Sequence, residues 1–236
     1  MARRFFRDLC YGIILLALLL AGYCYYQLPQ VNALPTLVRS GVSSHGASYV
    51  SLSQVPKVMQ EAIIDTEDHS FYTNCGISFE GIGRSLLSDL KSGKFEEGAS
   101  TLTQQLVRQH YLSSEKTISR KIKEVALALV VNKKYTKQEI LEMYLNSIYF
   151  GHGAWGVQAA AQVYFKKNVS QLSPAQCTLL AGLPQAPSYL DPLSNYKAAR
   201  DRQSQVLQSM VQAGDISQND AAKILNVPPG IPLQNK

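Results

Sequence analysis

Apolar residues recur at intervals of three and four along much of the chain after residue 53. This spacing places apolar side chains on one face of an α-helix. The runs that show it are Val55, Val58, Met59, Ala62 and Ile63; Phe79, Ile82, Leu86 and Leu90; and Ile118, Ile122, Val125 and Leu129. The pattern therefore predicts a mainly helical body.

Local signals for helix ends agree with this pattern. The segment Thr136-Lys-Gln-Glu139 is a capping box, and Ser173 precedes a proline that suits the first position of a helix. We expect two closing helices over residues 196–213 and 217–225 and a further helix near 118–134. Residues 227–236 contain three prolines and are expected to form a tail, because proline cannot extend a helix.

The first part of the chain has a different pattern. Residues 9–26 carry no charge, and about 20 apolar residues are what a membrane-spanning helix requires. The run ends in Tyr23, Tyr25 and Tyr26 and is followed by Gln27, where a cleaved signal peptide would show a site of small residues. We therefore predict an uncleaved span over 9–27, with a cleaved signal peptide as the alternative.

The basic residues before the span predict its direction. Arg3, Arg4 and Arg7 lie in residues 1–8, and positive charge favours the cytoplasmic side. Everything after the span is then extracytoplasmic. Residues 28–50, with two prolines and two glycines, suggest a linker with a short strand near 47–52, so the expected domain is 51–226.

Composition and charge narrow the class of protein. The chain is 46% hydrophobic and 17% charged, and its net charge of +6 (23 − 17) suits an anionic partner. The cysteines form no C-x-x-C pair and the histidines are widely separated, which argues against structural zinc. Cys75 and Cys177 are expected either to pair or to remain buried free thiols.

Two polar motifs stand out. Glu67 and Asp68 fall where the helix after residue 53 gives way to a turn, a place that catalytic groups favour. The segment 98–105 then brings hydroxyls and amides together at a predicted helix start, where backbone N–H groups also favour an anion. It suits sugar and phosphate oxygens, although each motif alone would also fit a capped helix with a solvated polar face.

A third motif is a carboxylate among cations. Glu124 shares its stretch of chain with Arg108, Lys116, Arg120 and Lys121. Nearby positive charge favours the ionised carboxylate. Taken alone, Arg120 and Glu124 are four residues apart and would form an ordinary helical ion pair.

The order of the motifs is more informative than any one of them. It runs E-D-x-x-F from Glu67, G-x-S-T-x-T-Q-Q from Gly98, R-K-x-x-E from Arg120, and K-x-x-I-L-E-x-Y-L-N from Lys137. Over residues 50–195 the chain resembles the peptidoglycan glycosyltransferases, the lysozyme-like domain of class A penicillin-binding proteins. Its length is similar to that of the monofunctional form, which has no transpeptidase.

The resemblance implies polymerisation of lipid II into β-1,4-linked glycan, with inversion at the anomeric carbon and release of undecaprenyl pyrophosphate. Glu67 matches the general base, and Glu124 matches the acid that assists the departing pyrophosphate, directly or through a divalent cation. The positions that match substrate-binding residues are Asp68, Arg84, Ser100, Thr101, Gln104, Gln105, Arg108, Lys116, Arg120 and Lys121.

The same resemblance sets the expected context. No tightly bound cofactor is implied, although Mg²⁺ or Mn²⁺ could accompany the pyrophosphate. Expected partners are lipid II, the growing glycan strand, the inner membrane and a separate transpeptidase or other cell-wall synthesis protein, with no nucleic acid. The alternative is a membrane-anchored lytic glycosidase, because two acids in a saccharide cleft also suit glycoside cleavage.

Overall fold

The computed structural model of the 236-residue chain describes residues 11, 22, 29–78, 80–81, 100–113, 115 and 117–231. Of the predicted span over 9–27, Tyr11 and Gly22 are described, and its other residues lie outside the described ranges. Arg84, Lys116 and most of the helix expected from Phe79 to Leu90 also lie outside them. Within the described part of the chain, no helix is long and apolar enough to cross a membrane.

The described part of the chain is helical, and its only pairing of extended backbone there is a single bridge between Tyr149 and Trp155. The α-helices are α2 (Leu34–Ser44), α3 (Lys57–Glu67), α5 (Leu102–Tyr111), α6 (Ile118–Lys134), α7 (Lys137–Ser147), α8 (Val157–Phe165), α9 (Pro174–Gly182), α10 (Tyr196–Ala213) and α11 (Gln218–Asn226). Short 3₁₀ turns are η1 (Val31–Ala33), η2 (Leu52–Gln54), η3 (Val169–Gln171) and η4 (Leu183–Gln185). The mainly helical prediction is confirmed.

The capping signals place helix ends correctly. Thr136 and Ser173 each accept a hydrogen bond from the backbone N–H three residues on, and each forms a full capping box. Ser217 caps α11 by accepting a hydrogen bond from the Asp220 N–H. Helices α6 and α10 cover the predicted ranges. Each cap satisfies N–H groups that the first helical turn leaves unpaired.

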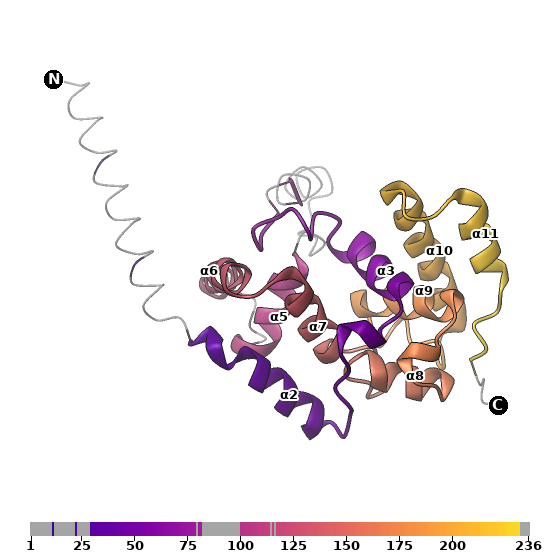
Figure 1. Ribbon diagram of the computed structural model, residues 1–236, viewed down its shortest axis with the longest axis horizontal. Helices are drawn as coiled ribbons and strands as arrows, with labels where there is room; N and C mark the ends of the chain where they lie inside the picture. Colours follow the sequence, from indigo (N-terminus) through magenta and orange to yellow (C-terminus); the bar gives the residue numbers. More distant parts are fainter. Residues whose placement is uncertain are drawn as a thin grey trace.

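The helices form two groups around a shared core (Figure 1). Helices α3, α9 and α10 pack against one another, while α5 packs against both α6 and α7, and α2 lies across α7. The largest fully buried side chains include Tyr144, Phe71 and Phe150. The C-terminal end of α3 meets the N-terminal end of α5 between the two groups, and this junction carries the candidate site.

The segment 28–50 corrects the sequence interpretation, because residues expected to form a linker form α2. Leu34, Val38 and Val42 lie four residues apart, are buried and share one face. Pro35 is tolerated because it sits in the first turn, where its missing N–H leaves no helical bond unmade. The strand expected near 47–52 is also absent from the described backbone there, and η2 begins at Leu52.

Helix α6 shows a second difference. Ile118, Ile122 and Leu129, expected on its core face, are 82%, 52% and 39% exposed. The core side instead holds Glu124, Leu127, Ala128 and Val131. Both faces of this helix are apolar over residues 125–131, so spacing alone could not identify the face that packs.

Cys75 and Cys177 do not form a disulfide. Cys75 is exposed and Cys177 is buried, and both are free thiols. Burial raises the pKa of the Cys177 thiol to about 12, which keeps it protonated and unreactive.

Candidate active site

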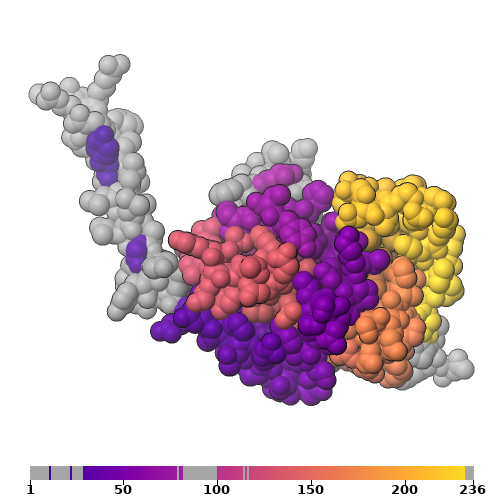
Figure 2. Space-filling model, in the orientation of Figure 1, coloured from indigo at the N-terminus to yellow at the C-terminus, as the bar shows by residue number. Residues whose placement is uncertain are grey.

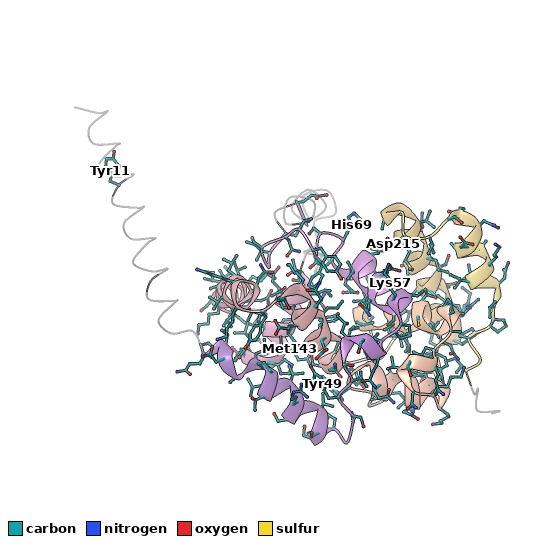
Figure 3. The ribbon with its side chains drawn as sticks, in the orientation of Figure 1. Tyr11, Tyr49, Lys57, His69, Met143 and Asp215 are labelled. Carbon is teal, nitrogen blue, oxygen red and sulfur yellow. The ribbon has the colours of Figure 1, made fainter. Side chains whose placement is uncertain are left out.

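Glu67 is the last residue of α3 and lies at a cavity of about 370 Å³. The helix ends here because Asp68 leaves the helical region, with φ −155° and ψ 71°. The cavity wall is polar, with Ser70, Ser100 and the α10 residue Gln212 among the lining side chains. His69, labelled in Figure 3, lines the same cavity in the turn after α3. Hydroxyls and amides of this kind suit hydrogen bonding to sugars.

The Glu67 carboxylate is 13% exposed and has a separate partner at each oxygen. Gln105 Nε2 donates a hydrogen bond of 2.9 Å to Oε2, and Arg202 Nη2 lies 3.9 Å from Oε1. Burial raises the pKa of Glu67, while the Gln105 hydrogen bond and the Arg202 and Arg108 charges oppose that rise. A carboxylate in such surroundings is suited to act as a general base.

The orientation of Gln105 is itself determined by a buried tyrosine. Tyr144 of α7 is fully buried, and its hydroxyl donates a hydrogen bond of 3.2 Å to Gln105 Oε1. With Oε1 engaged in this way, the amide nitrogen faces Glu67. The sequence analysis assigned no role to Tyr144. The only feature that could have pointed to it is its place in the K-x-x-I-L-E-x-Y-L-N motif.

Asp68 connects the turn after α3 to the start of α5. Its carboxylate is buried and accepts hydrogen bonds from the backbone N–H of Leu102 at 3.1 Å and from Asn74 Nδ2 at 2.9 and 3.1 Å. Ser70 Oγ donates a further bond of 3.3 Å. Burial raises the pKa of Asp68, and these bonds oppose the rise. The structure thus gives Asp68 a role in holding the site together, while contact with substrate stays a prediction.

Thr101 makes a second connection between the same segments. Its hydroxyl donates to the Gly76 carbonyl at 2.7 Å and accepts from the Gln104 N–H at 3.1 Å, which caps α5. Gly76 has φ +96°, and a Cβ there would lie 2.5 Å from the Ala128 carbonyl oxygen of α6. Only glycine fits this close approach. The buried hydroxyl of Thr101 is therefore used within the protein.

Glu124 is fully buried on the inner face of α6, where it holds two cations. Arg120 Nη1 lies 2.8 Å from Oε2, and Lys121 Nζ lies 2.5 Å from Oε1. Gln104 Nε2 also donates to Oε1, at 3.1 Å. The structure thus brings Glu124 together with the predicted residues Arg120, Lys121 and Gln104.

Lys121 links this cluster to the cavity wall. Its ammonium donates a hydrogen bond of 2.9 Å to Ser100 Oγ, and Ser100 lines the cavity with Glu67. Two cations and one carboxylate leave an excess of one positive charge beside the cavity. Charge-assisted donors of this kind are suited to phosphate oxygens.

The cluster does not form a set of metal ligands. The described residues contain no group of three or more histidine, cysteine or acidic side chains that could hold a metal ion. Both oxygens of Glu124 already face cationic or amide donors. These residues do not fit a resident divalent cation.

The structure is thus a helical domain with one cavity-facing acid and one acid among cations. The family profile described as Transglycosylase matches residues 35–211. A protein of Cupriavidus necator that is named for the same activity is 42% identical over 194 residues, which cover 82% of this chain and 81% of that protein. The chain belongs to the transglycosylase family, and it contains a peptidoglycan glycosyltransferase domain.

Two penicillin-binding proteins are similar to this chain over the same domain. Penicillin-binding protein 1A of Escherichia coli is 49% identical over 169 residues, covering 72% of this chain and 20% of that protein. Penicillin-binding protein 2a of Streptococcus pneumoniae is 42% identical over 186 residues, covering 79% of this chain and 25% of that protein. The chain therefore spans a quarter or less of the length of these two relatives. The family match begins within α2, which agrees with that helix being part of the domain.

Removing the Tyr144 hydroxyl tests its role in orienting Gln105. We expect Tyr144→Phe to lower the turnover of lipid II about three- to tenfold, the equivalent of one net hydrogen bond. Tyr135→Phe is the control, because its hydroxyl donates to the Val31 carbonyl at 2.8 Å away from Glu67. Equal turnover by the two variants, at equal thermal stability, would contradict the role.

Proposed function

We propose that this chain polymerises lipid II by inverting transfer of a glycan chain from an undecaprenyl-pyrophosphate-linked donor. The observation that carries the proposal is the way in which α5 separates the two acids. Gln105 holds Glu67 at the cavity, while the adjacent Gln104 holds Glu124 among the cations. A base and a pyrophosphate-binding cluster are the two elements that this reaction requires.

In the proposed step, ionised Glu67 takes the proton from the 4-hydroxyl of the acceptor N-acetylglucosamine. As that oxygen forms its bond to the donor anomeric carbon, the bond from the same carbon to the pyrophosphate oxygen breaks. The electron pair leaves with undecaprenyl pyrophosphate, and the configuration changes from α to β. Arg120 and Lys121 stabilise the charge that develops on the leaving group.

The cationic cluster favours this function over lytic cleavage with Glu124 as the acid. A lytic glycosidase must protonate a sugar oxygen as it departs. Glu124 accepts hydrogen bonds at both oxygens from Arg120, Lys121 and Gln104, so it presents no O–H group to a leaving sugar. The pyrophosphate leaves as an anion and needs charge stabilisation, which these side chains provide.

A divalent cation has no step in this proposal. If Mg²⁺ or Mn²⁺ assists the enzyme, pyrophosphate oxygens would supply its ligands, since Glu124 is already engaged. We also propose that this chain has no transpeptidase activity of its own and that a separate transpeptidase crosslinks the glycan strand it makes.

Replacing the proposed base tests the reaction. Glu67→Gln keeps the size of the side chain but removes its capacity to accept a proton, so polymerisation of purified lipid II should fall about 10² to 10⁴-fold. Glu61→Gln, on the same helix and in an ion pair with exposed Lys57, should retain near wild-type activity. Polymerisation by Glu67→Gln at the rate of that control would remove Glu67 from the mechanism.

We further propose a single-pass protein of the inner membrane, with residues 9–27 as its span and the catalytic domain on the periplasmic side. The first described residues after this span lie beside the C-terminal ends of α5 and α6, because Tyr111 donates to the Gln30 carbonyl and Tyr135 donates to the Val31 carbonyl. Helix α6 lies on the surface (Figure 2). Its exposed apolar stripe consists of Ile118, Ile122 and Leu129. Exposed lysines on the same helix suit lipid headgroups.

The exposed stripe of α6 can be tested with substrate in two forms. Ile118→Ser combined with Ile122→Ser should lower activity on bilayer-embedded lipid II at least about tenfold, because the interface loses two apolar side chains. Activity on a short-chain, water-soluble lipid II should not change. The control is Tyr189→Ser with Val227→Ser, which removes two other exposed apolar side chains. The same loss on both substrates would show that the stripe does not contact the membrane.

A further inference from the structure

Arg202 of α10 is a charged residue that the sequence motifs leave without a function. It approaches the Glu67 oxygen that Gln105 does not bond. Its Nη2 lies 3.9 Å from Glu67 Oε1, and its side chain is 15% exposed. Because α10 packs against α3, this contact joins the helix that ends in the base to a helix outside the cationic cluster.

The path of the Arg202 side chain depends on a glycine in α9. A Cβ on Gly182 would lie 2.7 Å from Arg202 Cγ and 3.4 Å from Val206 Cγ2. Gly182 has φ −80° and ψ −20°, which any residue can adopt. The backbone therefore does not require glycine here, whereas the stem of Arg202 does require the space.

Besides Glu67, the Arg202 guanidinium has one side-chain hydrogen-bond partner among the described residues. Arg202 Nη1 donates to Gln205 Oε1 at 2.9 Å, one turn along α10. Its Nε is buried and has no hydrogen-bond partner among the described residues. The side chain is thus directed toward Glu67 by packing and by charge, with one local hydrogen bond.

Several charged and titratable groups face Glu67. Burial raises the pKa of Glu67, the charges of Arg202 on α10 and Arg108 on α5 lower it, and neighbouring Asp68 raises it. The hydroxyl of Tyr144 on α7 also faces Glu67, and its pKa is raised well above the ordinary value, chiefly by burial. Among these groups, Arg202 is the charge that directly contacts the carboxylate.

We propose that Arg202 is a positioning residue for the catalytic base and that Gly182 provides the space through which it reaches Glu67. With Gln105 at one oxygen and Arg202 at the other, the carboxylate is held from two sides and kept ionised for proton transfer. This inference rests on the proposed function only in assigning the base, because the contact itself is independent of substrate.

The direct test is a titration of the Glu67 carboxyl in the full chain, labelled with ¹³C at glutamate side-chain carboxyls and assigned with Glu67→Gln. Arg202→Gln should raise the pKa of Glu67 by about half a unit to one unit, because a nearby opposite charge is lost. Arg202→Lys should raise it less. The control Arg200→Gln, which removes a guanidinium bonded to Gln203 and to the Leu225 carbonyl, should leave it unchanged.

Gly182→Ala tests the proposed space without touching either charge. It should raise the pKa of Glu67 in the otherwise wild-type chain and have no further effect when added to Arg202→Gln. An unchanged pKa in Arg202→Gln, or a Gly182→Ala effect that persists without the arginine, would overturn the proposal.

The pH dependence of lipid II turnover supplies a second measurement. Glu67 acts as a base when ionised, so a raised pKa moves the acid limb of the rate profile to higher pH and leaves activity recoverable at alkaline pH. A pH-independent loss in Arg202→Gln would indicate a merely structural role and contradict the proposal. If the wild-type chain makes no polymer, the proposed function fails, while the carboxyl titration still decides the role of Arg202.

Discussion

The site depends on the first turn of α5, where two adjacent glutamines each hold a different glutamate. Gln104 and Gln105 project in different directions because neighbouring residues of a helix are about 100° apart. One amide therefore reaches Glu124 on α6, and the other reaches Glu67 at the end of α3. The relative placement of the two acids follows from the position of this turn.

Buried polar contacts hold that turn in position. Thr101 caps it and bonds the Gly76 carbonyl, while Asp68 accepts the N–H of Leu102. These bonds tie the start of α5 to the turn after α3, so neither segment can move without leaving buried polar groups unpaired. Such losses are costly. Two residues that resemble substrate-binding positions thus contribute to the rigidity of the site.

The surroundings of the two glutamates suit them to different tasks. Glu67 borders a cavity, and burial raises its pKa, as is useful for a group that must accept a proton. Glu124 is fully enclosed, and its oxygens hold Arg120 and Lys121. The first acid is available to a reacting hydroxyl, while the second arranges cations for an anionic leaving group.

The sequence predicted the features that depend on local chemistry. Caps such as Thr136 and Ser173 marked helix starts correctly because their hydrogen bonds lie within four residues. It did not predict α2, whose buried stripe contains only three residues. It also did not predict which face of α6 packs, because that helix is apolar on both faces. These outcomes depend on packing against other helices, α7 and α5 for α2 and α5 for α6, which the spacing of apolar residues within one helix does not record.

Some residues of the candidate site were also visible in the sequence, and others were found only in the structure. The motifs and the family resemblance they carry made Glu67 and Glu124 candidates, and the structure brings Glu124 together with Arg120 and Lys121. Tyr144 and Arg202 were missed, since each acts through a contact across 39 or more positions of the chain. Gly182 gave no signal at all, because its role is to leave space for a side chain of another helix.

The central claim is that adjacent glutamines serve two acids with separate tasks, and single-atom changes in each glutamine test it most directly. Gln105→Glu and Gln104→Glu each replace one amide nitrogen by oxygen and keep the acceptor oxygen. The measurement is the turnover of lipid II as a function of pH, together with the binding of an isoprenyl pyrophosphate. Gln105→Glu should move the acid limb of turnover to higher pH without weakening pyrophosphate binding, and Gln104→Glu should weaken that binding without moving the limb. The same response from both variants would contradict the division of tasks.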